Sequence, residues 1–263
     1  MAQSYRARFA GSPLMFGMTP AVKWLLIVNT AIFVFCYLLS SAGEQLIGLF
    51  GLTPTAVVHY FAVWQLATYL FLHSPTTFTH ILMNMLTLWM FGVPLESVWG
   101  SRRFLRYYFF CGVGAGVSVV VLNYLLLFLF HIGNPEAVTI GASGAIYGLL
   151  LAFGMLFPDA RILFFFLFPI PARVYVWIMA AIVFLSTFGD TGGGVSNFAH
   201  LGGIVFGFVF LRLGLDRARW PEFHPLESIE SQYREWKMQR AKRKFQVYLR
   251  KHGQPPRDDR WVN

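Results

Sequence analysis

The sequence predicts an all-α membrane protein, a bundle of six membrane-spanning helices, and two observations carry this prediction. The first is composition: 56% of the 263 residues are hydrophobic and 13% are charged, whereas soluble domains are nearer a quarter charged. The second is a series of apolar runs, most of them long enough to cross a hydrocarbon core of about 30 Å. The runs fall at about 24–42, 78–94, 104–130, 144–157, 174–188 and 198–215.

These runs divide the chain into three expected parts. Residues 1–23 form a short N-terminal segment, 24–215 a six-span domain, and 216–263 a basic, helix-prone tail. The first run is longer than the apolar region of a typical signal peptide, so we interpret it as a retained span. In the tail, apolar and aromatic residues alternate with charge. This pattern fits either a helix lying on anionic lipid or a solvated helix.

The basic residues predict an orientation. If the N-terminus is cytoplasmic, the three outer loops at about 43–77, 131–142 and 189–197 contain none of the 21 Lys and Arg residues. Positive charge accumulates on the cytoplasmic side of membrane proteins. The net charge of +9 is therefore explained by topology, and nucleic-acid binding is a poor explanation for it.

Three connecting features complete the outline. The first outer loop carries aromatic residues of the kind that favour the membrane interface. They are Phe50, Tyr60, Phe61, Trp64, Tyr69 and Phe71. The inner stretch 161–173 is broken by prolines and is expected to be an interfacial connector. Cys36 and Cys111 both lie inside predicted spans, so we expect buried thiols and neither a disulfide framework nor a metal cluster.

Polar residues stand at the starts of the second, fourth and sixth predicted helices. His80 and Asn84 share one face of the second helix, Ser143 opens the fourth, and His200 lies in the first turns of the sixth. All three helices run inward from the outer side, so these residues lie at similar depth. Titratable groups at membrane depth usually face a bundle interior or a wet cavity.

Ser143 has two interpretations. In the first, the small residues around it serve only to let two helices pack closely. In the second, Ser143 is a nucleophile, and the small neighbouring residues leave space for a substrate carbonyl to approach it. Gly144 and Gly148 are four apart beside Ser143, and Gly203 and Gly207 are four apart beside His200. The two interpretations are compatible, because packing through these glycines would bring Ser143 and His200 together. The short fourth helix also predicts that Ser143 is recessed below the outer surface.

Three motifs together resemble the rhomboid intramembrane serine proteases. They are GASG at 141–144 with Tyr147, AHLGG at 199–203 with Gly207, and HILMN at 80–84. Each occurs on the helix where that family carries it, and the resemblance extends from about residue 24 to residue 215.

The resemblance implies a role for each matching residue. Ser143 matches the nucleophile and His200 the general base of a dyad without a carboxylate. His80, Asn84 and the Ser143 amide match the oxyanion hole. Further matches are Tyr147, which stacks on the histidine; Glu96, which ties the second helix to its neighbours; His73, a structural histidine of the first outer loop; and the glycines Gly141, Gly144, Gly203 and Gly207.

The chain departs from the family pattern at two positions. The family often has Trp-Arg in the first outer loop, whereas Trp64 is here followed by Gln65. The glycine expected four residues before Ala199 is Val195, with glycines at 192–194 just ahead of it. Both departures bear on loop packing or reaction rate, and neither changes the Ser–His pair.

The resemblance implies an intramembrane serine endopeptidase of bacterial six-span type, in a plasma membrane with both termini cytoplasmic. Its expected partners are transmembrane protein substrates and membrane lipids, without nucleic acid, metal or cofactor. Zinc and aspartyl protease chemistry lack the necessary residues, because there is no HExxH motif and no pair of carboxylates inside the spans. The alternative is a catalytically silent membrane chaperone or adaptor. The sequence does not determine the oligomeric state.

Overall fold

The computed structural model describes residues 17–164, 168–189 and 194–215, together with 238 and 240. By their internal contacts the residues form two units, Met1–Ala218 and Arg219–Asn263. Of the predicted basic tail, 216–263, only residues 238 and 240 are described, and most of the predicted N-terminal segment also lies outside the described residues. The predicted division into three parts stays a prediction.

Within the described residues, six apolar helices lie where the six apolar runs place them. Three are long and apolar enough to cross a membrane: α2 (Pro20–Leu38), α6 (Phe78–Trp99) and α7 (Ser101–Phe130). The other three helices contain shorter apolar segments; they are α8 (Ser143–Leu156), α9 (Ala172–Gly189) and α10 (Gly194–Leu213). The prediction of a helical membrane bundle is confirmed.

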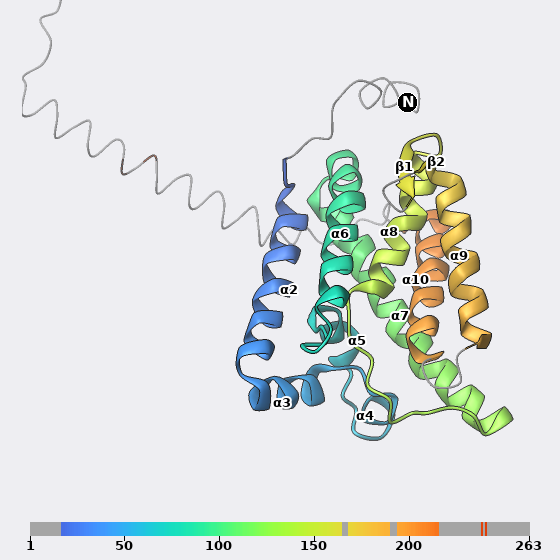
Figure 1. Cartoon of the computed structure of the whole chain (residues 1–263). Helices are drawn as coiled ribbons and strands as arrows, with labels where there is room; N and C mark the ends of the chain where they lie inside the picture. Colours follow the sequence, from blue (N-terminus) through green and yellow to red (C-terminus); the bar gives the residue numbers. More distant parts are fainter. Residues whose placement is uncertain (1–16, 165–167, 190–193, 216–237, 239, 241–263) are drawn as a thin grey trace, which may run out of the picture. The chain divides into compact units, whose positions relative to one another are not determined.

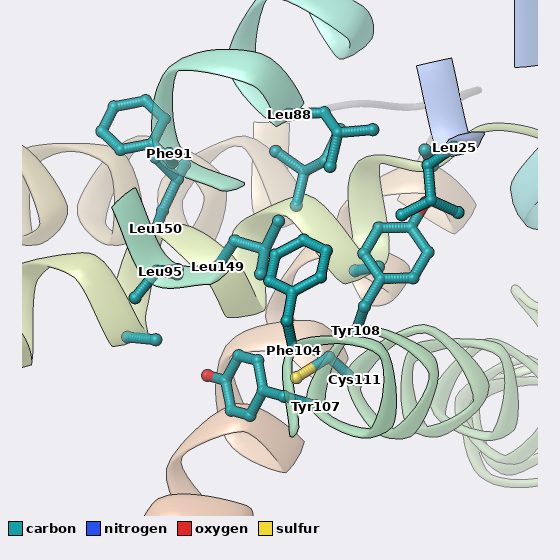
Figure 2. Packing of buried hydrophobic residues seen from close by; sticks show 14 of the residues in the cluster. Leu25, Leu88, Phe91, Leu95, Phe104, Tyr107, Tyr108, Cys111, Leu149 and Leu150 are labelled. Atoms are coloured by element: carbon teal, nitrogen blue, oxygen red, sulfur yellow. The ribbon is translucent and has the colours of Figure 1, made fainter. Parts of the chain in front are cut away.

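The centre of the bundle is formed by α7, α8 and α10, which pack against one another (Figure 1). On one side α9 packs on α8 and α10, and on the other α2 packs on α6. Figure 2 shows part of the buried core between these helices: Leu25, Leu88, Phe91, Leu95, Phe104, Tyr107, Tyr108, Cys111, Leu149 and Leu150. Both cysteines are free and buried, as predicted.

Apolar side chains also cover much of the outside of the bundle. Exposed examples occur on α2, α7 and α9, and include Leu38, Phe128, Trp177 and Leu185. Exposed apolar side chains on this scale are unfavourable in water. They fit a bundle surrounded by lipid.

The start of α2 is held by Glu96 of α6. The first backbone N–H groups of a helix have no partner within the helix. Here the Glu96 carboxylate accepts hydrogen bonds from the N–H groups of Ala21 (2.8 Å) and Val22 (2.9 Å). It also accepts one from the Ser101 hydroxyl at the start of α7 (2.6 Å). Glu96 therefore joins α2, α6 and α7 at one end of the bundle, as the resemblance implied.

The first outer loop contains short helices that the sequence did not predict. They are α3 (Ser40–Phe50), α4 (Pro54–His59), α5 (Gln65–Thr68) and the 3-10 helix η1 (Tyr69–Phe71). Since α3 begins at Ser40, the first span ends at Leu38 and not at residue 42. The labelled helices α3, α4 and α5 lie toward the lower end of the bundle in Figure 1.

Most aromatic residues of this loop are at least partly exposed, but Tyr69 is not. Its side chain is 1% exposed, and its hydroxyl donates a hydrogen bond to the Gly112 carbonyl of α7 at 2.8 Å. The expectation that Tyr69 lies at the membrane interface was therefore wrong. A buried tyrosine with a partner for its hydroxyl is a stable alternative.

The inner connector is a β-hairpin. Strands β1 (Arg161–Phe164) and β2 (Phe168–Pro171) pair antiparallel, with Ile162 opposite Ile170. The prolines at 169 and 171 prevent this stretch from continuing as a helix. The expectation of a connector in place of a full span agrees with this finding, although the strands themselves were not predicted.

Candidate active site

Ser143 and His200 are hydrogen-bonded to each other. Ser143 is the first residue of α8 and His200 lies in α10, and Ser143 Oγ is 2.8 Å from His200 Nε2. The two residues are far apart in sequence and meet only because α8 and α10 pack together. An imidazole nitrogen at this distance from a serine hydroxyl is in position to accept its proton.

The close packing of α8 and α10 depends on glycines. A Cβ atom added at Gly203 would collide with the carbonyl oxygen of Gly144. One added at Gly148 would lie 3.2 Å from the Gly203 carbonyl oxygen, and one added at Gly207 3.3 Å from Gly148 Cα. The two backbones are therefore in direct contact. The structure thus shows α8 and α10 packed through these four glycines, as the sequence predicts.

Tyr147 packs on His200. Their rings are stacked, with centroids 4.4 Å apart and planes 30° apart. Tyr147 lies one helical turn after Ser143, so one face of α8 presents both side chains to α10. Among the described residues no carboxylate is hydrogen-bonded to His200, and the tyrosine ring is what restricts the orientation of the imidazole.

Gly141 shapes the backbone that leads into Ser143. Its φ of +122° is a conformation that side chains strongly disfavour. Its N–H donates to the Tyr69 carbonyl at 3.0 Å, and an added Cβ would lie 2.9 Å from His80 Nε2. Glycine is therefore required here for both its backbone conformation and its lack of a side chain.

His80 and Asn84 lie on α6 and face the same cavity as Ser143. The Asn84 side-chain amide donates a hydrogen bond to the backbone carbonyl of His80 at 2.8 Å. An asparagine amide has two N–H donors, so one remains for a ligand in the cavity. The third predicted donor, the Ser143 N–H, belongs to the unpaired first turn of α8, where the helix dipole favours negative charge.

The cavity beside Ser143 has a volume of about 730 Å³. Its walls come from α6, α8, α9, α10, the segment 138–141 and three residues of the first outer loop, Tyr69, Ser74 and Thr77. Several wall residues were not foreseen from the sequence: Met83, Thr87, Tyr175 and Met179. Met83 and Thr87 are three and seven residues after His80, so helical spacing on α6 could have indicated them. Tyr175 and Met179 have no such signal, because they reach the cavity only when α9 packs on α8.

His73 lies next to this site. Its ring centroid is 5.2 Å from that of His80, and its side chain is 1% exposed. Burial, together with the neighbouring His80, lowers the pKa of His73 to about 4. The imidazole is therefore neutral at pH 7, and the structural role of His73 stays a prediction.

Two of the remaining predicted residues, Glu96 and Gln65, do not line the cavity. Glu96 is sixteen residues after His80 on α6, about 24 Å along the helix at 1.5 Å per residue. Gln65 is buried in the outer loop at 3% exposure. Val195 belongs to α10, but its side chain lies outside the described part of the structure, as do Gly192 and Gly193.

Comparison with known proteins identifies relatives. The Rhomboid domain family matches residues 60–217. The chain is 35% identical over 138 residues to "Rhomboid protein 1, mitochondrial" of Saccharomyces cerevisiae, covering 52% of this chain and 38% of that protein. It is 26% identical over 193 residues to "Rhomboid-like protease 3" of Toxoplasma gondii, covering 71% of this chain and 66% of that protein.

A bacterial relative is "Rhomboid protease GluP" of Bacillus subtilis, 28% identical over 179 residues. The match covers 68% of this chain and 31% of GluP. The chain thus spans less than two thirds of the length of each of these three relatives. The family match covers more than half of the chain and includes every residue placed around the cavity. The chain belongs to the rhomboid family.

Proposed function

We propose that this protein is an intramembrane serine endopeptidase that hydrolyses peptide bonds in or near transmembrane segments of other membrane proteins. The observation that carries the proposal is the 2.8 Å hydrogen bond between Ser143 Oγ and His200 Nε2 beside the cavity. The names of the Toxoplasma and Bacillus relatives, both proteases, support it.

In the proposed reaction, His200 Nε2 takes the hydroxyl proton as Ser143 Oγ attacks the carbonyl carbon of the peptide bond. The carbonyl oxygen becomes an oxyanion, stabilised by the Ser143 N–H, the free N–H of Asn84 and an N–H of His80. His200 then gives its proton to the leaving amine, and an acyl ester remains on Ser143. Water attacks this ester by the same route, releasing a carboxylic acid and restoring the hydroxyl.

The proposed substrates are transmembrane helices with weak segments. A stable helix holds its carbonyl groups in hydrogen bonds, so a segment weakened by Gly or Pro exposes a peptide bond more easily. The cavity suits such a segment because apolar side chains such as Met83, Ile146 and Met179 line it together with Ser143 and His200. This chemistry requires no metal or cofactor, and we assign 24–215 as the unit that carries it out.

The experiment that tests the proposal uses a fluorophosphonate probe, which forms a covalent bond with activated serines. The purified protein in detergent is expected to be labelled, and the variant Ser143→Ala is expected not to be. A silent chaperone or adaptor with the same fold would bind transmembrane helices without being labelled. Equal labelling of wild type and Ser143→Ala, or none in a well-folded wild type, would contradict the proposal.

We further propose that the cavity opens toward the outer side of a bacterial plasma membrane and that both termini are cytoplasmic. The distribution of Lys and Arg supports this orientation. The orientation also requires the first two outer loops to share one side of the bundle, and Leu52 and Thr139 exchange backbone hydrogen bonds of 3.0 and 2.8 Å between them. The two loops must therefore lie on the same side.

Reporter fusions test this orientation. Fusions after residues 60 and 136 are expected to report the outer side, and a fusion after residue 102 the cytoplasmic side. The physical reason is that the region around residue 102 carries Arg102, Arg103 and Arg106, whereas the outer loops carry no Lys or Arg. A cytoplasmic signal from the fusion at 136 would place Ser143 near the opposite surface and would exclude the proposed orientation.

A further inference from the structure

Gln65 occupies the position at which the chain departs from the Trp-Arg pattern, and its side chain makes two hydrogen bonds to backbone. Its Oε1 accepts from the Thr53 N–H at 3.0 Å, and its Nε2 donates to the Leu49 carbonyl at 3.2 Å. With 3% of its surface exposed, both ends of the amide are used inside the protein. Trp64 Nε1 donates to the same Leu49 carbonyl at 3.0 Å and the Thr68 hydroxyl donates to the Phe50 carbonyl at 2.7 Å. Gln65 is the residue of this group that also binds the Thr53 N–H, and so it connects the two ends of the turn between α3 and α4.

That turn is paired with the segment that leads to the nucleophile. Leu52, which lies between the two backbone groups held by Gln65, forms the two-bond pair with Thr139. Thr55 continues the contact: its N–H donates to the Pro135 carbonyl at 3.0 Å, and its hydroxyl donates to Glu136 at 2.7 Å. Thr139 is four residues before Ser143.

The short helix α5, which begins at Gln65, also contacts the segment 139–141, through the residue that follows its C-terminal end. It continues into Tyr69, whose carbonyl accepts the Gly141 N–H at 3.0 Å. The Tyr69 hydroxyl is in turn bonded to the Gly112 carbonyl in α7. Thr139 and Gly141, on either side of Ile140, are therefore both held by the outer loop, one through the Gln65 turn and one through Tyr69.

We propose that Gln65 is a positioning residue for Ser143: by holding the turn 49–53, it fixes the segment 139–141 and so the backbone that carries the nucleophile. Gln65 does not line the cavity and acts through the turn that it holds, chiefly through the Leu52–Thr139 pair. As far as catalysis is concerned, the inference rests on the proposed function. The ordering of the segment is a property of the fold and is testable without it.

The test compares two buried amides. Gln65→Met keeps a side chain of similar length and removes both hydrogen bonds. The matched control is Asn123→Leu. Asn123 is 1% exposed, donates to the Val119 carbonyl and accepts from the Asn134 N–H. It therefore anchors the same outer loop 131–142, but at a point well before Thr139.

The first measurement is amide hydrogen exchange of the peptides that cover 136–142, in detergent and well below the melting temperature of each variant. Gln65→Met is expected to raise the exchange rate there about tenfold, because removing a buried partner leaves the Thr53 N–H unsatisfied and loosens the turn. Asn123→Leu is expected to leave it within about twofold at Thr139 and Gly141. Unchanged exchange in Gln65→Met would overturn the proposal.

The second measurement is catalytic. For Gln65→Met we expect kcat and the rate of fluorophosphonate labelling to fall about tenfold and KM to change much less, because the walls from α6, α8, α9 and α10 stay in place while the segment that carries the nucleophile is less well held. Asn123→Leu is expected to keep wild-type kcat even if its melting temperature falls equally. An equal loss of kcat in both variants would mean that Gln65 contributes stability alone. Failure of the wild type to label would reject the proposed function, and the exchange result would still decide the role of Gln65.

Discussion

Replacing Ser143 with alanine is expected to abolish detectable cleavage of a transmembrane substrate, and replacing His200 with alanine is expected to do the same. The first change removes the attacking oxygen and the second removes the only base within hydrogen-bond reach of it among the described residues. Neither change should unfold the bundle, because the α8–α10 contact is made by glycine backbones and not by these two side chains. The measurements are kcat and KM with one substrate in detergent, together with a thermal melt of each variant.

The double variant Ser143→Ala with His200→Ala is expected to be no less active than either single variant. Residues that act as one unit are far from additive, since losing one member already removes the function of the other. Residual cleavage in one of the single variants that is lost in the double variant would show that the two residues work independently. Full activity in well-folded Ser143→Ala would end the protease proposal.

Asn84→Ala supplies a graded comparison for these variants. It removes one proposed oxyanion donor and leaves two, and loss of one such donor typically lowers kcat by about 10²–10³-fold. KM should change little, because the oxyanion exists only after attack. A large rise in KM with kcat preserved would instead assign Asn84 to substrate binding.

Replacing Gly203 with alanine is expected to damage both the fold and the site. The added methyl group would overlap the carbonyl oxygen of Gly144, a backbone atom that no side-chain rotation can move away. Overpacking typically destabilises by about 1–3 kcal/mol, which lowers the melting temperature by several degrees in a protein of this size. Because α8 and α10 must separate, the Ser143–His200 hydrogen bond should lengthen. A misplacement of about 1 Å lowers turnover about 10²-fold.

The matched control is Gly48→Ala. Gly48 lies inside the short helix α3, and a Cβ atom added there meets nothing within 4 Å. Alanine in a helix interior is more stable than glycine by about 0.5–1 kcal/mol, so this variant should keep its activity and melt no lower than wild type. Wild-type kcat and melting temperature in Gly203→Ala would show that the two helices are not held at backbone contact.

The sequence alone was sufficient for the six helices of the bundle. Lipid offers no hydrogen bonds to the backbone, so a spanning segment must be a long apolar helix, and such segments are visible as runs of residues. The closeness of Ser143 to His200 was also predictable, because small residues four apart mark the faces through which membrane helices pack. In both cases a local pattern carries the information.

The outer loop shows what only the tertiary structure decided. Nothing local indicates that Leu52 pairs with Thr139 or that Tyr69 is buried, and the aromatic character of Tyr69 led to the wrong placement at the membrane interface. The position of a loop residue depends on which distant backbone groups it can reach, such as the carbonyl of Gly112 and the N–H of Gly141, and those groups come within reach only after the helices have packed. The same reason applies to the cavity walls from α9 and to Gln65. The apolar runs and glycine spacings of this sequence therefore determine the bundle and the Ser–His pair, while the contacts that hold the nucleophile loop depend on distances that arise only in the folded protein.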